Sequence, residues 1–575
     1  MWFIRSPERM KTEVEAIESL RSREAWLGAT ENRMLKGLKF GVEFDLIING
    51  EALAFMLEYP AFFPETPPLV IPCDGRRYSS HQYGAGGELC LEFRSDNWDP
   101  SVTGAMMIES AYRLLSGEQP SANERAVVPS AHQETTGQRL RGFGFRFLLT
   151  RNLRAHVGTL AANTGHACSV VEITGPNKTW ITYVAAIGPA SGPAWREDSI
   201  PEHDNSGQPA LLIRVPSLAD TPISDQASLD RLIAATACEA IPANDNVLAR
   251  ITVVADAQDV RLYFSYRDNS GWALIPYCTV DLGDEALRLP EAYAALTSKR
   301  VGIVGAGSLG SKIAASLARS GVRGFVLVDD DILKPENLTR HELDAGSLGA
   351  HKVDGVEVRL HAVAPRVDVS PRRTVLGGQE SSGTTASVLD ELATCDLLID
   401  ATADPQAFNF VASVARRALR PIIWAEVYAG GIGGFVGRLR PDVEPPPHAA
   451  RRQYLAWCRD QGAPWQGEGR RYDANRDGAP PLVADDADVA VIAAHASRMA
   501  VDVLIRPDTS AFPHPAYVIG LSAEWIFDEP FDTRPIDFSP EGVWRAEITE
   551  AQADAAVDYV VSLLDKSIDE DRTGA

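Results

Sequence analysis

Apolar spacing in the N-terminal stretch predicts a helix, then strands, then a second helix. Between residues 8 and 25 the apolar positions recur every three or four residues, at Met10, Val14, Ile17 and Leu20. That spacing predicts an amphipathic helix. Apolar runs at 40–48 and 52–59 predict strands, and helical spacing returns over about 102–115. We therefore expect a small fold of mixed α and β structure in the first 120 residues.

The middle of the chain is dominated by strand-like runs. Ser121 to Thr136 is polar and contains proline, which predicts a linker. The runs that follow are at 144–149, 169–173, 179–185, 249–254 and 260–266, with exposed loops expected at 188–193 and 201–208. A basic cluster, Arg139, Arg141, Arg146, Arg151 and Arg154, is interpreted as a solvated face or domain contact, or as a docking surface for an acidic partner. We predict an α+β connecting domain without chemistry of its own.

In the last stretch, short apolar runs alternate with helical segments. Strands are predicted at 300–304, 324–328, 397–399 and 421–427, and helices at 312–320 and 485–505. This alternation is typical of a parallel sheet with helices on its faces. Edge strands are predicted at 515–520 and 524–527, a last helix at 550–564, and a disordered acidic tail at 565–575.

Composition narrows the class of protein. A chain of 575 residues predicts three or four domains, and 45% hydrophobic with 23% charged residues is ordinary for globular protein. The net charge of −23 argues against nucleic-acid binding. We find no apolar run long enough for a membrane span, and the N-terminus becomes charged too early for a signal peptide. The seven cysteines are widely spaced, which indicates reduced thiols and a cytoplasmic location.

The first candidate site follows the strand that begins at Arg300. This strand breaks at Gly305, Gly307 and Gly310, the pattern of a tight turn whose backbone N–H groups hold a phosphate at a helix N-terminus. The acids after the next strand, Asp329 and Asp331, are placed to bind ribose hydroxyls. Taken alone, these residues favour an NAD-dependent oxidoreductase.

Further polar residues change this interpretation. Asn337, Arg340 and Lys352 follow the acids, and Asp404 lies after a later strand. A dinucleotide needs none of them, whereas a triphosphate attacked at its α-phosphorus needs cations and a carboxylate that holds a metal. We therefore predict ATP and Mg²⁺ as cofactors, with Asp404 as the metal ligand and Asp400 as the next candidate.

This series of motifs resembles the adenylating domain of the ubiquitin-activating, ThiF and MoeB superfamily. The resemblance covers Gly305 to Asp404, with Asp400 and Asp404 one residue further apart than usual. It implies a Rossmann-like adenylation domain in which Arg340 is catalytic, and a homodimer. It also implies a thioester-forming cysteine in a crossover loop, here about 438–484. Cys458 lies there, and its neighbours Arg451, Arg452 and Arg459 predict a lowered thiol pKa.

A second resemblance covers residues 8 to about 116. Four prolines lie between Pro60 and Pro68, and Cys90 precedes Trp98 by eight residues. This pattern resembles the ubiquitin-conjugating enzymes and implies that Cys90 carries a ubiquitin-like C-terminus as a thioester. Where that family has His-Pro-Asn, this chain has His81-Gln82-Tyr83. Gln82, Asn97 or a backbone N–H is the candidate oxyanion donor, and the sequence does not choose between them.

Together the two resemblances predict a multidomain α+β and α/β protein. The predicted parts are a ubiquitin-conjugating-like domain, a linker domain, a ThiF-like adenylation domain and a C-terminal helix with its tail, at 1–120, 121–297, 298–545 and 546–575. The chain resembles bacterial activating–conjugating fusions found with cyclic-oligonucleotide anti-phage systems.

That resemblance implies adenylation, thioester formation, transfer to Cys90 and ligation to an amine on a target protein. The passenger would be a ubiquitin-like protein or the C-terminus of a cGAS-like nucleotidyltransferase. The alternative is a sulfur-carrier-type adenylyltransferase with a non-catalytic N-terminal binding domain. The sequence does not identify the passenger, the final acceptor, the role of the middle domain or the oligomeric state.

Overall fold

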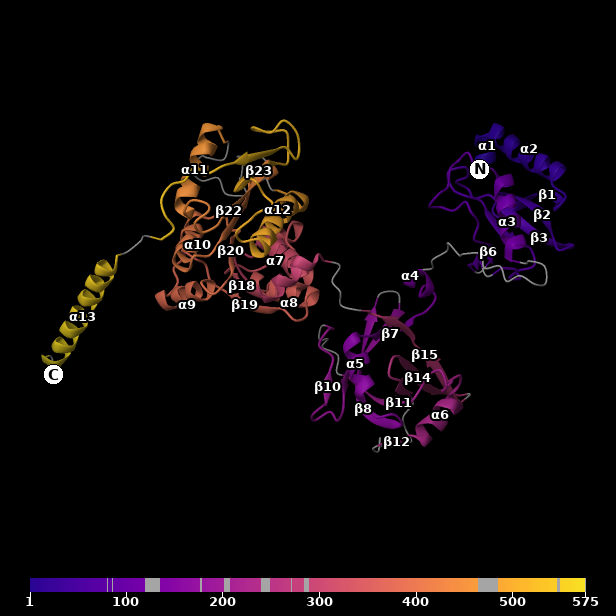
Figure 1. The fold of residues 1–575 in the computed structure, drawn as a ribbon, viewed down its shortest axis with the longest axis horizontal. Coiled ribbons are helices and arrows are strands. Elements are labelled where there is room, and N and C mark those ends of the chain that lie inside the picture. Colours follow the sequence, from indigo (N-terminus) through magenta and orange to yellow (C-terminus); the bar gives the residue numbers. More distant parts are fainter. Residues whose placement is uncertain are drawn as a thin grey trace. The chain divides into compact units, whose positions relative to one another are not determined.

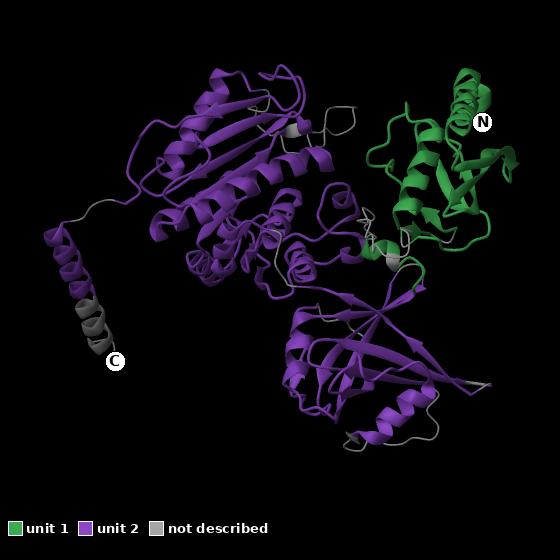
Figure 2. Ribbon diagram, turned by 45° about the vertical axis from the view of Figure 1, so that its right-hand side comes forward, with its two compact units in different colours: residues 1–143 green, residues 144–575 purple. Residues whose placement is uncertain are grey.

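The chain forms two compact units, Met1–Phe143 and Gly144–Ala575 (Figures 1 and 2). The structure, a computed structural model, describes residues 1–575 except 80, 85, 119–134, 176–177, 201–206, 239–248, 270, 284–288, 464–483, 546–548 and 574–575. Most of the predicted linker and part of the predicted loop at 201–208 therefore lie outside the described residues. The four-part division of the chain stays a prediction.

The first unit is built on an antiparallel sheet of order β1-β2-β3-β4. Its strands are β1 (Leu27–Leu35), β2 (Lys39–Ile48), β3 (Glu51–Glu58) and β4 (Leu69–Pro72), with a small ladder of β5 (Gln82–Tyr83) and β6 (Glu88–Leu89). Its helices are α1 (Trp2–Arg5), α2 (Pro7–Arg23), α3 (Gly104–Glu118) and α4 (Thr136–Arg139). The predicted helices and strands of this unit are confirmed by α2, α3, β2 and β3. Ile17 and Leu20 on α2 are buried in one core with residues of β2 and β3.

A buried carboxylate fixes α2 against the rest of this unit. Glu13 accepts hydrogen bonds from the Tyr59 hydroxyl at 2.7 Å and from the Gly104 amide at 2.6 Å. Arg9 pairs with the same carboxylate at 2.8 Å. Since Glu13 is fully buried, this hydrogen-bonded ion pair satisfies a charge that would otherwise be strongly destabilising.

The second unit begins with a mixed sheet of order β15-β14-β13-β11-β8-β9-β7-β16, with β10 beside β9 and β12 beside β8. Its elements are β7 (Phe145–Leu149), α5 (Arg151–Thr159), β8 (Thr164–Gly175), β9 (Thr179–Ile187), β10 (Trp195–Arg196), β11 (Gln208–Arg214), α6 (Gln226–Ala235), β12 (Ala237–Cys238), β13 (Ala249–Ala255), β14 (Val260–Asp268), β15 (Gly271–Pro276) and β16 (Cys278–Asp281). The Tyr277 amide, just before β16, donates to the Leu262 carbonyl of β14 at 2.9 Å, so the sheet curls towards closure. In the predicted basic cluster, Arg154 pairs with Asp281 at 2.5 Å, which favours a structural role for that residue.

The C-terminal sheet has the order β19-β18-β17-β20-β21-β22-β23-β24, parallel from β19 to β21 and antiparallel beyond. Its strands are β17 (Arg300–Val304), β18 (Gly324–Val328), β19 (Asp368–Arg372), β20 (Leu397–Asp400), β21 (Ile422–Val427), β22 (Gly433–Leu439), β23 (Ala516–Gly520) and β24 (Thr533–Ile536). The helical segments are η2 (Glu291–Ser298), α7 (Ser308–Ser320), η3 (Pro335–Thr339), η4 (Ala345–Ser347), α8 (Lys352–Val363), α9 (Ser382–Leu392), α10 (Pro405–Ala418), η5 (Ala429–Gly431), α11 (Pro447–Asp460), α12 (Asp486–Ile505) and α13 (Glu550–Thr573).

Helices cover both faces of this sheet, as the sequence predicted. One core joins the sheet to α7, α8 and α12, and a second core joins the opposite face to α9, α10 and α11 (Figure 1). The strand order reverses at β17, because β18 lies on one side of it and β20 on the other. In open α/β sheets the carboxyl ends of the strands at such a reversal form the usual ligand crevice.

Three local predictions are wrong. Residues 515–520 contain β23, which is not an edge strand because β22 and β24 pair with it on either side. Residues 524–527 form a turn and not an edge strand, because Trp525 has a left-handed backbone (φ 60°) and its indole N–H donates to the Gln461 carbonyl at 2.7 Å. The tail predicted to be disordered continues α13 to Thr573. Its first helix-breaking residue is Gly574, so nothing in the sequence stops the helix earlier. Within the described residues, we find no helix with the length and apolar character that a bilayer span requires.

Candidate functional site

The glycine turn after β17 is shaped by two close backbone approaches. Gly305 has φ +90°, and a Cβ there would lie 2.9 Å from the Thr402 side chain. A Cβ on Gly310 would lie 1.8 Å from the Gly305 carbonyl oxygen. These two positions therefore require glycine for the turn itself. Gly307 differs, because a Cβ there would meet no protein atom within 4 Å. Its lack of a side chain leaves space for a ligand.

The predicted acids have separate structural roles. Asp329 accepts hydrogen bonds from the Ala306 amide at 2.8 Å and the Asp331 amide at 2.9 Å, so it braces the glycine turn. Burial raises the pKa of the Asp329 carboxyl. Asp331 instead forms an ion pair with Lys352 at 2.5 Å. Burial would raise the pKa of Asp331, but the hydrogen bond and charge of Lys352 outweigh it and leave that pKa lowered.

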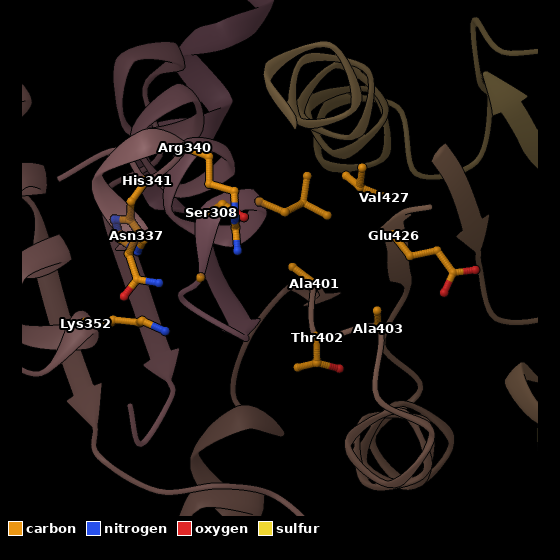
Figure 3. Close-up of a pocket in the computed structure, with 12 residues that line it drawn as sticks. Ser308, Asn337, Arg340, His341, Lys352, Ala401, Thr402, Ala403, Glu426 and Val427 are labelled. Atoms are coloured by element: carbon orange, nitrogen blue, oxygen red, sulfur yellow. The ribbon is translucent and has the colours of Figure 1, made fainter. Parts of the chain in front are cut away.

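Two cavities meet at the carboxyl ends of β17 and β20, and Gly307, Ala401 and Thr402 line both. The first has a volume of about 210 Å³ and is also lined by Ser308, Leu309, Asn337, Arg340, His341, Lys352, Ala403, Glu426 and Val427. Figure 3 shows Asn337, Arg340 and Lys352 on one side of it and Glu426 on the other. The second, of about 220 Å³, is lined by Asp329, Asp330, Asp404 and the apolar Val375 and Leu376. The structure thus brings the predicted cations together in one cavity and two of the predicted acids together in the other.

His341 is a site residue that sequence reasoning missed. Its Nε2 lies 2.9 Å from the Ala306 carbonyl, which can only accept, and its Nδ1 accepts from the Leu343 amide at 3.2 Å. These partners fix the neutral ring with the proton on Nε2. Burial lowers the pKa of His341 to about 4. The ring therefore ties the segment that carries Arg340 to the glycine turn without adding charge. In the sequence, its position next to Arg340 was the only signal that could have identified His341 as a site residue.

The segment between Asp400 and Asp404 turns at the backbone of Ala403. Ala403 adopts a left-handed conformation (φ 54°), which non-glycine residues rarely occupy. Asp404 then becomes the N-cap of α10, where its Oδ1 accepts from the Gln406 amide at 2.7 Å. Asp400 remains 1% exposed, with its Oδ1 accepting from the Thr402 hydroxyl at 2.6 Å. Of the two acids, only Asp404 lines the cavity that also contains Asp329 and Asp330.

A buried polar network lies behind the first cavity and was also missed. The Tyr454 hydroxyl on α11 donates to Glu426 Oε1 of β21 at 2.7 Å and lies 2.8 Å from the Tyr428 hydroxyl. In Figure 3 the Glu426 carboxylate points away from Arg340 and Lys352. Burial raises the pKa of Glu426 to about 7 and that of Asp400 to about 6. The network fastens α11 to the sheet.

The predicted lowering of the Cys458 pKa is wrong. Cys458 lies on α11 and is completely buried, and burial raises its pKa to about 12 despite Tyr454 and Arg459. The predicted basic neighbours act elsewhere, since Arg451 stacks 4.9 Å over the Phe408 ring and Arg452 pairs with Glu541 at 2.5 Å. Part of the predicted crossover loop, 464–483, lies outside the described residues. The role of Cys458 as an acyl carrier stays a prediction.

Cys90, in the first unit, lies at a cavity of about 570 Å³. The cavity is lined mainly by apolar residues, together with Tyr83, Arg94, Ser95, Asp96 and Gln138. Cys90 is partly exposed, and burial raises its pKa against the lowering effect of Arg94. The indole of Trp98 donates to the Pro64 carbonyl at 2.7 Å, so the proline-rich crossing and the segment after the thiol support each other.

The two candidate oxyanion side chains are held by the backbone. Gln82 is 6% exposed, and its Oε1 accepts from the amides of Tyr78 at 2.5 Å and Ser79 at 3.0 Å. Its Nε2 donates to the Gly87 carbonyl at 2.7 Å. Asn97 accepts from the Arg94 amide at 2.7 Å and donates to the Glu92 carbonyl at 2.8 Å. Both side chains therefore brace loops around Cys90, and neither lines its cavity.

The cavities of the second unit fit a nucleotide. The Thr374 hydroxyl is buried at the second cavity with no hydrogen-bond partner among the described residues. A buried hydroxyl of this kind requires a partner, which a ligand can supply. We find no group of three or more His, Cys, Asp or Glu side chains that could hold a metal within the described part of the chain. Magnesium bound with a nucleotide needs only one or two protein carboxylates, and Asp404 uses one oxygen for its cap.

Comparison with known proteins identifies part of the chain. Residues 285–475 match the model of the ThiF family. The uncharacterized protein y4qC of Sinorhizobium fredii is 25% identical over 414 residues, 65% of this chain and 68% of that protein. The ATP-dependent ubiquitin transferase-like protein Cap2 of Enterobacter hormaechei is 35% identical over 123 residues. That match spans 21% of this chain and 20% of Cap2.

Escherichia coli MccB, whose structure was solved with ATP, is 16% identical, with a TM-score of 0.33 over 44% of this chain and 67% of that chain. The ThiF match confirms the predicted resemblance of the C-terminal part, which is a Rossmann-like ThiF domain.

Proposed function

We propose, from the premise that residues 285–475 form a ThiF-family domain, that this chain adenylates the C-terminal carboxylate of a protein with ATP and passes the acyl group to Cys90. An amine on a target protein is the final acceptor. The observation that supports this most is the pair of joined cavities, one with cations and the other with acids. The similarity to Cap2, an ATP-dependent ubiquitin transferase-like protein, agrees with it.

In the first step, an oxygen of the passenger's carboxylate attacks the α-phosphorus of ATP, and pyrophosphate leaves with the electrons of the broken P–O bond. Negative charge therefore grows on the phosphate oxygens. Arg340 and Lys352 line the cavity where charge of this sign is stabilised, and Gly307 with the N-terminus of α7 offers backbone N–H groups. Arg340 is thus the residue proposed to act in catalysis.

The second cavity would hold the nucleoside. Asp329 and Asp330 present carboxylates suited to ribose hydroxyls, and Val375 and Leu376 offer apolar contact to a base. Asp404 would hold Mg²⁺, which when bound supplies charge neutralisation to the triphosphate. Asp331 contributes by holding Lys352, and His341 and Asn337 hold the Arg340 segment, since Asn337 Oδ1 accepts from the Lys334 amide at 2.9 Å.

In the second step a thiolate attacks the acyl carbon of the adenylate, and AMP leaves. The predicted relay through Cys458 would require α11 to unpack, because that thiol is completely buried. Cys90 is partly exposed and lines a cavity large enough for a peptide tail. We therefore propose Cys90 as the thiol that holds the acyl group before ligation, whether or not Cys458 carries it first.

Nucleotide binding tests the first step without any passenger. We expect the full chain to bind the ATP analogue AMPCPP with Mg²⁺ in calorimetry, and the Arg340→Ala variant to bind it at least about tenfold more weakly. Arg359→Ala is a matched control, because Arg359 pairs with Glu342 at 3.0 Å and does not line either cavity. Tight binding of NAD instead would revive the oxidoreductase interpretation.

Intact-mass measurement tests the second step. The chain would be mixed with ATP, Mg²⁺ and purified proteins encoded by neighbouring genes, and we expect a thiol-sensitive mass increase located on Cys90. Passenger-dependent ATP–pyrophosphate exchange without any adduct on Cys90 would favour the alternative, an adenylyltransferase with an N-terminal binding domain.

A further inference from the structure

The short ladder of β5 and β6 places Tyr83 and Cys90 on one face. In this antiparallel pair Gln82 lies opposite Leu89 and Tyr83 lies opposite Glu88. The Cys90 amide donates to the His81 carbonyl at 2.8 Å, which extends the ladder by one residue. Since side chains alternate between faces, Tyr83 and Cys90 are diagonal neighbours, a separation that an aromatic side chain can bridge. Both residues line the same cavity.

The chemistry at Cys90 needs a hydrogen-bond donor. When an amine attacks a thioester, the carbonyl oxygen becomes an oxyanion, and a placed donor lowers the energy of that state. Gln82 and Asn97 are occupied in bracing the backbone and lie outside the cavity. Arg94 lines the cavity, but its Nε and Nη2 bind Asp96 at 3.0 Å and 3.1 Å. Among the described residues that line the cavity, Ser95 and Gln138 also carry donor groups, and the Tyr83 phenol is the donor that the β5–β6 ladder places diagonally beside Cys90.

We propose that the Tyr83 hydroxyl donates a hydrogen bond to the oxyanion formed when an amine attacks the acyl group on Cys90. This inference rests on the proposed thioester at Cys90. The amine lone pair forms the C–N bond, and the C=O π electrons move to the oxygen that Tyr83 stabilises. The amine loses a proton to solvent. The carbonyl then reforms, the C–S bond breaks, and Cys90 leaves as a thiolate that takes up a proton from solvent.

The surroundings of Tyr83 keep it a donor. Burial raises its pKa, and the negative charges that Cys90 and Glu88 can carry raise it further. The phenol therefore remains protonated at neutral pH, including the moment when the Cys90 thiolate is released.

A chemically loaded enzyme tests this without ATP or a passenger. The full chain would react with a synthetic peptide thioester that ends in glycine, so that exchange places the peptide on Cys90. Because Cys73 is also exposed, a Cys73→Ser background and digestion before mass analysis restrict the readout to Cys90. Hydroxylamine or free lysine is then added, and the loss of the Cys90 adduct is followed in a single turnover.

We expect fully loaded Tyr83→Phe to lose the acyl group to the amine about 10²-fold more slowly than the fully loaded parent, as for other lost oxyanion donors. Tyr78→Phe is the matched control, since the Tyr78 phenol belongs to the same loop, donates to Asp74 at 2.5 Å and does not line the cavity. It should aminolyse at the parental rate. An equal thermal midpoint for both variants would exclude a loss of folding as the cause.

The outcomes separate this inference from the proposed function. If Cys90 in the parent accepts no peptide while Cys73 in the wild-type chain does, the thioester itself is in doubt. If Tyr83→Phe loads and aminolyses at the parental rate, Tyr83 is not the donor although Cys90 is reactive. A slow Arg94→Ala beside a normal Tyr83→Phe would assign the role to Arg94 and overturn the proposal.

Discussion

Cys90 and Cys458 are two thiols whose pKa values are raised by the same cause, yet they differ in what can reach them. Cys90 follows a two-residue strand at the edge of a cavity of about 570 Å³ and is partly exposed. Cys458 lies on a helix of 14 residues, is completely buried and is held there by Tyr454. Because burial raises both pKa values, exposure is the feature that separates the two thiols.

The largest effect should come from removing each thiol in turn. We expect Cys90→Ala to abolish amide-linked product, because no other described cysteine lines that cavity. Cys458→Ala should retain ATP–pyrophosphate exchange, which needs no thiol. If burial excludes Cys458 from transfer, this variant also retains the Cys90 adduct and the amide product. The Cys90 adduct and the amide-linked product are measured by non-reducing gel and intact mass. Loss of the Cys90 adduct in folded Cys458→Ala would establish the relay through α11.

Alkylation should separate the two thiols by access alone. In the native chain we expect iodoacetamide to modify Cys458 at least about 10³-fold more slowly than Cys90, because a buried thiol reacts only when its helix opens. Because the pKa of Cys90 is raised, its labelling should still be increasing with pH at pH 9. Cys73, an exposed thiol of the same unit, is the internal reference in peptide mass analysis. Equal labelling of Cys90 and Cys458 would show that α11 opens readily.

The anchoring of α11 should depend on pH through Glu426. Its pKa of about 7 lies above the unfolded value of 4.5, so the folded state binds the proton more tightly. The stabilisation from this proton is complete below about pH 4.5 and is lost as pH rises to about 7. As pH rises from 5 to 8, the free energy of unfolding of the Glu426→Gln variant should therefore increase by about 2 to 3 kcal/mol relative to that of the wild type.

Thermal unfolding of the second unit at these pH values measures the difference. Asp400, whose pKa of about 6 is also raised by burial, should leave a smaller dependence of the same sign in the variant. If the thermal unfolding midpoints of the wild type and Glu426→Gln change with pH in the same way, Glu426 does not hold a buried proton.

The smallest effect should be that of Gln82. Because its amide satisfies the Tyr78 and Ser79 amides and the Gly87 carbonyl, Gln82→Ala should destabilise the first unit by about 2 kcal/mol. Asn97→Ala, with two exposed hydrogen bonds, should cost less. Limited proteolysis on heating compares the stability of the first unit in the two variants. A stable Gln82→Ala variant that loads normally but aminolyses slowly would return Gln82 to the role of oxyanion donor.

The sequence predicted the strands β17, β18, β20, β21 and β23 of the C-terminal sheet because their signals are local, and it did not predict β19, β22 and β24. A buried run such as Gly324–Val328 and a helix such as Asp486–Ile505 show in the apolar spacing. The glycine turn was readable for the same reason, since Gly305 and Gly310 have backbone requirements that only glycine meets. The turn at Trp525 was misjudged because its apolar residues pack on the core from a loop.

The site residues that were missed depend on contacts between distant segments. Tyr454 meets Glu426 from 28 positions away, and His341 meets Ala306 from 35. No pattern in one sequence records such pairs. The Cys458 error has the same origin. Its basic neighbours in sequence are turned by the helix towards Phe408 and Glu541, whereas the thiol faces the core.

The left-handed turn at Ala403 bears on how such chains vary in length. It lies in the short loop between the end of β20 at Asp400 and the start of α10 at Pro405. Insertions or deletions at this point should therefore be tolerated more readily than substitutions on either side of it. The glycine turn has no such freedom, because a Cβ on Gly310 would lie 1.8 Å from the Gly305 carbonyl oxygen.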